Sequence, residues 1–250
     1  MCALLAVFAP PSIHTQVIHM NSVPKTSADS LKLLVFIGTV RESTPPRPAR
    51  LGLRVARACE QWFQQREIDI QMVDPLDIPM DRVFKPHFSY AKQKAPAALD
   101  SLAQKIESAD GFVMVSPEYN HAMSPALADL LNHFGSSLFA YKPSAIVTYS
   151  AGQWGGARAA VNMRTFLSEL GCLPVSAMVH VPHADRVFES SGRFVDDGQA
   201  QAWNGYIGRT LEQLIWWATA ARLQRGSDAV IAPGPMTQAP YERDAPQSGE

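Results

Sequence analysis

The chain has 250 residues, of which 46% are apolar and 18% charged, and its net charge is −1. This composition suits one globular α/β domain, and the near-zero charge gives no electrostatic reason to expect nucleic acid or an anionic membrane as a partner. No apolar run approaches the roughly 18 residues that a membrane-spanning helix needs. The three cysteines are too few and too widely spaced for a disulfide framework or a metal site, and we expect Cys59 and Cys172 to be small buried residues.

Residues 1–30 are expected to form a disordered leader. Residues 1–11 are apolar, but no basic residue precedes them and Pro10 and Pro11 end the run early. A secretory signal peptide normally has a positive start and a longer apolar core, and a mitochondrial presequence is rich in arginine. Secretion and mitochondrial import are therefore less favoured than a cytoplasmic location.

Strand and helix patterns then alternate along the chain. Short apolar runs predict strands at residues 31–37, 68–73, 112–115, 144–149 and 175–181. Helical spacing predicts helices at residues 50–66, 96–108, from about Ser124, at 157–170, and from a cap at Asp196 or Asp197 to about Leu223. Residues 77–95 lack a clean period, and residues 226–250, rich in proline and polar groups, are expected to be a disordered tail.

Five strand–helix units predict an α/β domain over residues 31–225. Strands that are apolar on both faces indicate a parallel sheet covered by helices, and five units fit a doubly wound five-stranded sheet with helices on both faces better than an eight-unit barrel. In such folds, ligands bind at the carboxyl ends of the strands near the point where strand order reverses. The loops after the first, third and fourth strands are therefore the candidate site.

The first of these loops reads GTVREST, residues 38–44. Thr39 and Ser43 or Thr44 offer hydroxyl groups, Arg41 offers a bidentate guanidinium, and the free amide groups of the following helix favour an anion. Neither Gly-x-x-x-x-Gly-Lys-Ser/Thr nor Gly-x-Gly-x-x-Gly is present, which disfavours a nucleoside triphosphate or dinucleotide site. The alternative is a polar surface loop in which Thr44 caps the helix.

The third-strand loop reads SPEYNH, residues 116–121. Pro117 fixes φ, and Glu118, Tyr119 and Asn120 place an acid, a ring and an amide at one strand end. A flat ligand is held by a ring face together with a few fixed hydrogen bonds. Instead of contacting a ligand, Glu118 could be only a charge near the following helix. His121 could likewise be a solvent-facing side chain.

The fourth-strand loop reads SAGQWGG, residues 150–156. Its glycines let the backbone approach a ligand closely because they lack a Cβ atom. Trp154 either covers that ligand or packs on a neighbouring element. One glycine-rich loop is weak evidence, whereas three ligand-like loops at one edge of a sheet are stronger evidence.

These residues resemble the NAD(P)H-dependent FMN reductases, a flavodoxin-like family that includes quinone, azo-compound and chromate reductases. The segment SPEYNHAMSPALADLLNHF is similar to the family's Pro-Glu-Tyr-Asn signature and following helix, and the first and fourth loops resemble its Gly-Ser-x-Arg and glycine-rich loops. The resemblance implies that Thr39 and Arg41 bind the FMN phosphate. It further implies that the ribityl chain and the edge of the ring are held by Pro117, Glu118, Tyr119 and Asn120. In the fourth-strand loop, Ala151 and Gly152 would give backbone contacts to the ring, Gly155 and Gly156 would shape the loop, and Ser150 is counted among the cofactor-binding residues.

The first loop departs from the family pattern. Residues 43–48 are a proline-rich insertion, so that Arg50 takes the position of a later arginine in the family motif. Contacts of Ser43, Thr44, Arg47 and Arg50 with the phosphate are therefore left open, since the insertion either weakens phosphate binding or clamps it.

The implied activity is hydride transfer from NADPH or NADH to FMN and then to a flavin, quinone or similar small acceptor by a ping-pong scheme. No catalytic residue is expected, since the difficult chemistry belongs to the flavin and Gly-x-Ser-x-Gly is absent. Two alternatives are kept: a flavodoxin-type FMN electron carrier, which is disfavoured by the neutral charge, and a non-catalytic binding module that has lost the cofactor.

The last predicted helix carries an aromatic stripe. Its large side chains are Trp203, Tyr206, Ile207, Leu211, Leu214, Ile215, Trp216 and Trp217. Such stripes are usually core, but adjacent tryptophans cannot both point the same way, so one of Trp216 and Trp217 is a candidate for contact with a partner subunit. The family resemblance implies a homodimer or homotetramer.

Overall fold

A computed structural model describes residues 31–43, 50–81, 83–91 and 94–227. The expected leader, nearly all of the expected tail, and Thr44 and Arg47 of the first loop lie outside the described residues.

The described residues contain one sheet of five strands that are all parallel, in the order β2-β1-β3-β4-β5. The strands are β1 (Lys32–Ile37), β2 (Asp69–Val73), β3 (Gly111–Pro117), β4 (Pro143–Tyr149) and β5 (Leu173–Val181). This confirms the predicted fold, since 2-1-3-4-5 is the flavodoxin-like order and reverses between β1 and β3. The loops after β1 and β3 therefore leave the sheet side by side.

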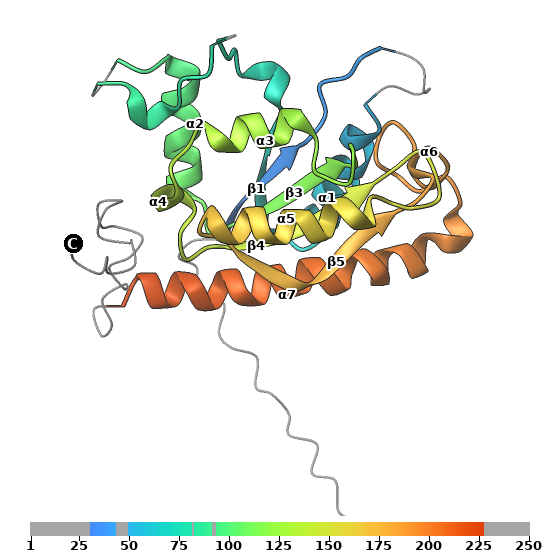
Figure 1. The fold of residues 1–250 in the computed structure, drawn as a ribbon. Helices are drawn as coiled ribbons and strands as arrows, with labels where there is room; N and C mark the ends of the chain where they lie inside the picture. The colour runs from blue at the N-terminus through green and yellow to red at the C-terminus, as the bar shows by residue number, and fades with distance from the viewer. Residues whose placement is uncertain (1–30, 44–49, 82, 92–93, 228–250) are drawn as a thin grey trace, which may run out of the picture.

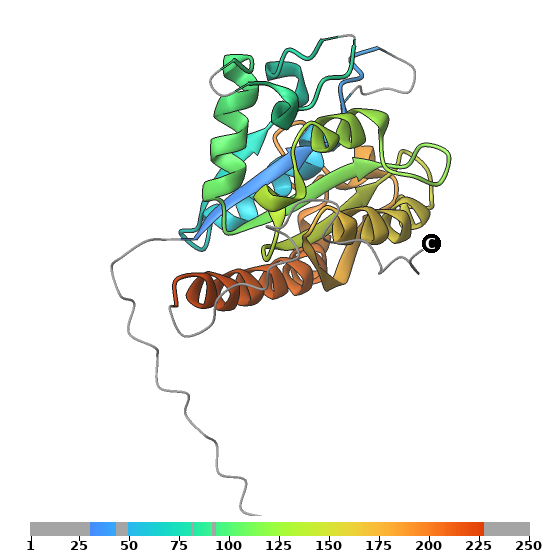
Figure 2. The same cartoon turned by 60° about the vertical axis from the view of Figure 1, so that its left-hand side comes forward.

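Helices cover both faces of the sheet (Figures 1 and 2). One face packs against α1 (Leu51–Gln64) and α7 (Ala200–Arg225), and the other against α2 (Ala97–Ser108), α3 (Pro125–Asn132) and α5 (Ala157–Glu169). The short helices are α4 (Ser136–Phe139) and α6 (Ala184–Val187), with 3₁₀ turns η1 (Pro75–Asp77), η2 (His87–Ser89) and η3 (Asp197–Gln199).

Alternation along each strand divides the core into two clusters. In β1, Leu33 and Val35 belong to the cluster under α1 and α7, whereas Leu34 and Phe36 belong to the cluster under α2, α3 and α5. Both faces are thus apolar, which is why the strands read as continuous apolar runs. Cys59 and Cys172 are buried, as expected, and burial raises the pKa of each thiol to about 12.

Several element boundaries differ from the predictions for local reasons. Ser124 is the N-cap of α3 and accepts a hydrogen bond from the Leu127 amide, but α3 ends at Asn132 and a separate short α4 follows. Asp196 caps η3, and the long helix α7 starts only at Ala200. Ile207, Leu211 and Leu214 of the aromatic stripe are buried as expected, but both tryptophans of the pair are exposed rather than one of them, with exposed fractions of 63% for Trp216 and 46% for Trp217.

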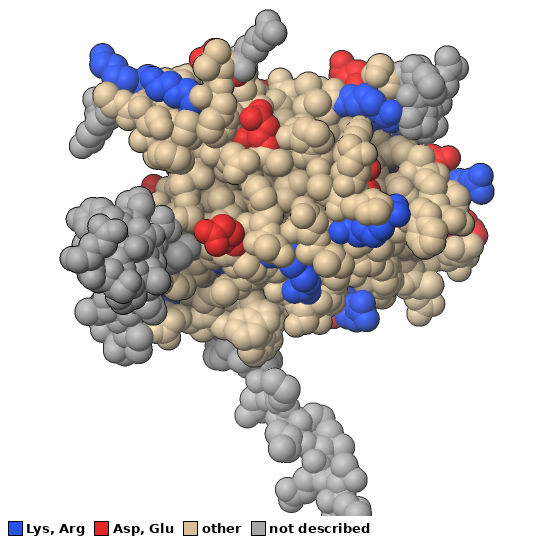
Figure 3. Space-filling model, viewed as in Figure 1, with Lys and Arg blue, Asp and Glu red and all other residues tan. Residues whose placement is uncertain are grey.

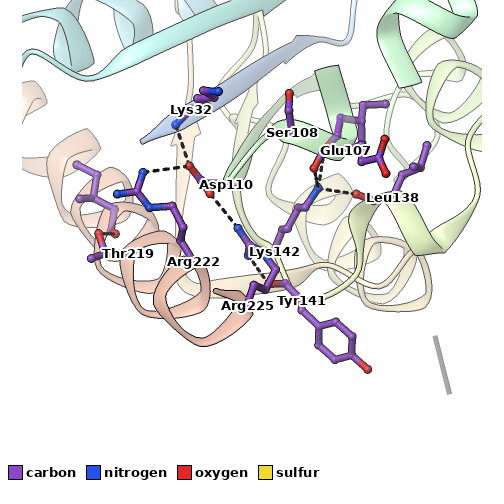
Figure 4. Close-up of polar contacts among 12 residues, drawn as sticks. Lys32, Glu107, Ser108, Asp110, Leu138, Tyr141, Lys142, Thr219, Arg222 and Arg225 are labelled. Atoms are coloured by element: carbon purple, nitrogen blue, oxygen red, sulfur yellow. Dashed lines mark hydrogen bonds and ion pairs between the residues drawn. The ribbon is translucent and has the colours of Figure 1, made fainter. Parts of the chain in front are cut away.

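A buried carboxylate joins three elements at the amino-terminal edge of the sheet (Figure 4). Asp110 accepts hydrogen bonds from the Lys32 backbone amide at 3.0 Å and from Arg225 at 2.9 Å, and it lies 3.6 Å from Arg222. Beside it, the Lys142 ammonium donates to three carbonyls, of Ile106, Glu107 and Leu138, at 2.6, 2.7 and 2.9 Å. The Asp110 contacts fasten the end of α7 to the edge of the sheet opposite the predicted site, and the Lys142 contacts join the start of β4 to α2 and α4.

No helix among the described residues is both long and apolar enough to cross a bilayer. On the face drawn in Figure 3, the charged side chains of both signs are scattered over several elements.

Candidate functional site

A cleft of about 230 Å³ opens at the carboxyl ends of the strands. Its walls come from the ends of β1, β3 and β4 and from the start of α1. The lining residues are Thr39, Arg41, Arg50, Leu51, Pro117, Glu118, Tyr119, Tyr149, Ser150 and Ala151. The three loops singled out in the sequence therefore meet in one hollow.

The first loop leaves β1 through a tight contact with β3. The Gly38 amide donates to the Val115 carbonyl at 2.7 Å, and a Cβ atom at Gly38 would lie 2.5 Å from that oxygen. Only glycine fits this crossing, which sets Thr39 and Arg41 against the cleft. Thr39 is buried, and Arg41 is half-buried.

The start of α1 forms the second wall, and it is packed against the end of β4. A Cβ atom at Gly52 would lie 2.5 Å from the Tyr149 hydroxyl oxygen and 2.9 Å from Thr39 Cγ2. Burial raises the pKa of the Tyr149 phenol, although a hydrogen bond with Thr39 opposes the shift. Because the first turn of α1 has no acidic residue and begins at the cleft, its free amide groups favour an anionic ligand group.

Arg50 lines the cleft but is paired with a carboxylate. Its Nη2 atom lies 2.8 and 2.7 Å from the two Asp74 carboxylate oxygens and 3.0 Å from the Thr39 carbonyl oxygen. Both side chains are largely buried, and Arg50 adopts a left-handed conformation at φ 51° as the N-cap of α1. Much of its positive charge is thus neutralised by Asp74, which follows directly after β2.

The third-strand loop is a tight hairpin turn. The Tyr119 and Ala122 backbones exchange two hydrogen bonds at 3.0 and 2.9 Å, and the two residues between them, Asn120 and His121, have φ values of 50° and 65°. Type I′ turns need positive φ at both central residues, and asparagine tolerates it well. The turn leaves Tyr119 with 44% of its surface exposed at the cleft.

Glu118 lies at the end of β3 and is paired across to α5. Its Oε1 atom is 2.6 Å from Arg158 Nη2, and the side chain is only 10% exposed. Arg158 also lies 5.7 Å from the centre of the Trp154 ring. Glu118 is therefore a desolvated carboxylate with one cationic partner, beside the cleft.

The fourth-strand loop is fixed from within and from the chain after β5. The Ser150 hydroxyl donates to the Gly152 carbonyl at 2.6 Å and accepts from the Gly155 amide at 2.9 Å. The His183 amide donates to the same Gly152 carbonyl at 3.0 Å. A Cβ atom at Gly152 would meet nothing within 4 Å, so its backbone is open to a ligand.

The structure brings most of the predicted site residues together. Those that line the cleft are Thr39, Arg41, Arg50, Pro117, Glu118, Tyr119, Ser150 and Ala151. Gly152 follows directly after Ala151, Asn120 is at the tip of the hairpin turn, and Gly155 is buried against the end of β5. Ser43 is exposed and is not among the lining residues, and Thr44 lies outside the described residues.

Sequence reasoning missed four residues of the site. Leu51 and Tyr149 line the cleft, and Asp74 and Arg158 pair with lining residues. Tyr149 was identified only as the end of a strand, although a polar phenol closing an apolar run was a signal for the site. Within the described residues no group of three or more histidine, cysteine, aspartate or glutamate side chains is arranged to hold a metal ion.

The fold is that of a flavodoxin-like protein, and its cleft brings an arginine, a tyrosine ring and the Ala151 residue to one hollow. Among solved structures, the chain is similar to FerB, a flavoenzyme NAD(P)H:(acceptor) oxidoreductase from Paracoccus denitrificans. The TM-score is 0.57 at 18% identity, over 76% of this chain and 98% of FerB. At that identity the likeness supports the fold alone.

The model of the NADPH-dependent FMN reductase family matches residues 31–186, more than half of the chain, and the chain belongs to that family. It is 30% identical to an NAD(P)H-dependent FMN reductase of Pseudomonas aeruginosa over 51% of this chain and 69% of that protein. It is 31% identical to a quinone reductase of Escherichia coli over 45% of this chain and 62% of that protein. The predictions of an NAD(P)H-dependent flavin oxidoreductase, with FMN as cofactor and NADPH or NADH as co-substrate, are confirmed.

Proposed function

We propose that the cleft binds FMN and that a nicotinamide and a small acceptor then use it in turn. The observation that supports this most directly is the convergence of Arg41, Tyr119 and Ala151, from three separate loops, on one hollow. An arginine, an aromatic ring and open backbone are the groups that a phosphorylated flat ligand requires.

The phosphate end of the cofactor is assigned to the first loop. Thr39 offers a hydroxyl group, Arg41 a guanidinium, and the first turn of α1 its free amide groups. Arg50 contributes less than its sequence position suggests, because Asp74 already holds its guanidinium at 2.7 Å. Arg41 is therefore the main cationic contact in the proposal.

The ring end is assigned to the other two loops. Tyr119 presents a half-exposed ring, Ala151 lines the cleft, and Gly152 follows it with open space where a Cβ atom would lie. Amide groups aimed at the ring would stabilise negative charge that develops there on reduction. When bound, FMN supplies the hydride chemistry, and the protein binds, orients and tunes it.

The two-substrate scheme requires that part of the bound FMN stays accessible. At about 230 Å³ it is smaller than the roughly 300–1,000 Å³ of pockets that enclose a ligand of drug size. FMN would keep part of its surface outside, where NADPH or NADH and then a flavin, quinone or similar acceptor have access in a ping-pong scheme. The names of the Pseudomonas and Escherichia relatives support these acceptor classes.

The test is the visible spectrum of the purified protein with FMN, before and after anaerobic addition of NADPH or NADH. We expect a yellow protein that bleaches, and a second addition of a quinone should restore the colour. A yellow protein that ignores both nicotinamides would instead be an electron carrier. A colourless protein that takes up no FMN would be a binding module without cofactor.

Assembly as a homodimer or homotetramer is part of the proposal. The half-exposed tryptophan pair on α7, Trp216 and Trp217, supports a subunit contact because large exposed aromatic side chains are common at interfaces. Light scattering after gel filtration measures the subunit number. A mass of 27.4 kDa would be the monomer and would contradict the assembly.

A further inference from the structure

We propose that Glu118 and Arg158 form a charge-neutral pair that sets how tightly the protein holds reduced FMN relative to oxidised FMN. Glu118 lies beside the cleft, and Arg158 is a positioning residue that acts through Glu118. The inference rests on the proposed function, because it assumes that the cleft holds the flavin. It adds a residue, Arg158, that the lining of the cleft does not include.

The pair is asymmetric in its burial. The Glu118 side chain is 10% exposed and the Arg158 side chain is 50% exposed, with 2.6 Å between Oε1 and Nη2. The second carboxylate oxygen, Oε2, is buried and has no hydrogen-bond partner among the described residues. A buried carboxylate depends strongly on its counter-ion, since charges in a low-dielectric interior are weakly screened.

The position of Arg158 is unfavourable for a cation taken alone. Arg158 is the second residue of α5, and the amino-terminal end of a helix carries partial positive charge. The first turn of α5 holds no acidic residue that would offset this. Glu118 therefore supplies the main compensation for the charge of Arg158. The centre of the Trp154 ring also lies 5.7 Å from Arg158 Cζ.

The charge of the pair bears directly on flavin reduction. Reduction places negative charge on the flavin, so an unpaired carboxylate at the cleft would oppose it and an unpaired guanidinium would favour it. In the native protein the two charges cancel. Glu118→Gln leaves a net charge of about +1 and Arg158→Gln a net charge of about −1 at the same place, since arginine stays protonated in proteins.

The experiment measures the dissociation constants of oxidised and reduced FMN for the holoprotein and its variants by anaerobic redox titration against a reference dye. For Glu118→Gln we expect the ratio of the two dissociation constants to shift about tenfold in favour of reduced FMN, which raises the two-electron midpoint potential by about 30 mV. Arg158→Gln should shift it in the opposite direction. The double variant and Arg158→Lys should lie close to the native ratio, because both keep the local charge near zero.

Arg164→Gln is the matched control, since Arg164 is also on α5 but binds the Val175 and Ser176 carbonyls at 2.7 and 2.6 Å. An unchanged ratio in Glu118→Gln would overturn the inference even if Arg158→Gln fails to fold. Equal shifts of the same sign in both single variants would also overturn it. The two variants change the local charge in opposite directions, so the charge argument requires opposite shifts, whereas a purely structural role does not. A protein that takes up no FMN contradicts the proposed function itself, which separates the two failures.

Discussion

Arg50 and Asp74 form a largely buried ion pair between the start of α1 and the end of β2, with 2.7 Å between Nη2 and Oδ2. The pair lies at the wall of the cleft where the phosphate of FMN is assigned. Asp74 places a negative charge beside Arg50, so it lowers the positive potential that Arg50 would otherwise provide at the proposed phosphate site.

Asp74→Asn is therefore expected to strengthen FMN binding. The amide keeps the shape of the side chain but removes its charge, so that Arg50 acts on the phosphate without a competing anion. We expect FMN affinity to rise about 3- to 10-fold while riboflavin affinity stays constant, within the usual range for one charge near a surface. Fluorescence titration with both ligands measures the ratio. A drop in FMN affinity would mean that Asp74 serves mainly to orient Arg50.

Arg41→Ala tests the phosphate contact itself. Loss of a charge-assisted hydrogen bond is expected to weaken FMN binding by about 1.5–3 kcal/mol. Riboflavin, which lacks the phosphate, should bind as before. Arg57→Ala is the control, since Arg57 is on α1 but binds the Ser190 carbonyl. Equal weakening of FMN and riboflavin would remove Arg41 from the phosphate contact.

Gly52→Ala should disrupt the wall of the cleft. The added Cβ atom would lie 2.5 Å from the Tyr149 hydroxyl oxygen, so α1 or β4 has to shift. We expect a loss of about 1–3 kcal/mol in the free energy of unfolding, as for other overpacked positions, together with weaker FMN binding. Gly205→Ala on α7 is the control, because its Cβ atom meets nothing within 4 Å and alanine favours a helix. Urea denaturation measures the free energy of unfolding of both variants, and similar values for Gly52→Ala and Gly205→Ala would contradict the packing argument.

Lys142 predicts a specific pH dependence of stability. Burial, together with the nearby Arg225, lowers the pKa of its ammonium from 10.5 to about 8. Between these two values the unfolded chain holds more protons than the folded protein, so this contribution to stability rises with pH and is lowest below pH 8. The ammonium nevertheless satisfies three carbonyls, so Lys142→Met also carries a cost that does not depend on pH.

The measurement is the free energy of unfolding of the native protein minus that of Lys142→Met from pH 7 to 10. We expect this difference to be flat below about pH 8 and to rise in favour of the native protein above it. The effect of the buried Cys59 thiol is common to both proteins and cancels. Cys172 interacts electrostatically with Lys142, but burial raises the pKa of its thiol to about 12, above the range of the measurement. Lys105→Met, at an exposed lysine of α2, is the control variant. A difference that falls above pH 8 would contradict the burial argument.

The strands and the three loops could be predicted because their signals are local. The apolar runs of β1, β3 and β4 follow from burial on both faces, and the polar groups after each strand mark its carboxyl end. In a parallel sheet these ends lie at one edge, so Thr39, Glu118 and Ser150 could be grouped before their distances were known.

The partners of these residues could not be predicted, because each depends on how separate elements pack. Arg50 and Asp74 are 24 residues apart, and Arg158 meets Glu118 only because α5 starts beside the end of β3. The sequence indicated that one of Trp216 and Trp217 leaves the core, but not that both do, because the phase of α7 is set by Leu211, Leu214 and Ala218, which face the sheet.

A crystal structure of the protein with FMN tests the central claim most directly. We predict the phosphate within hydrogen-bond distance of Thr39 and Arg41, and the ring against Tyr119 and the backbone of Ala151 and Gly152. Electron density for FMN at any other place on the protein, with these three loops left without ligand, would contradict the claim.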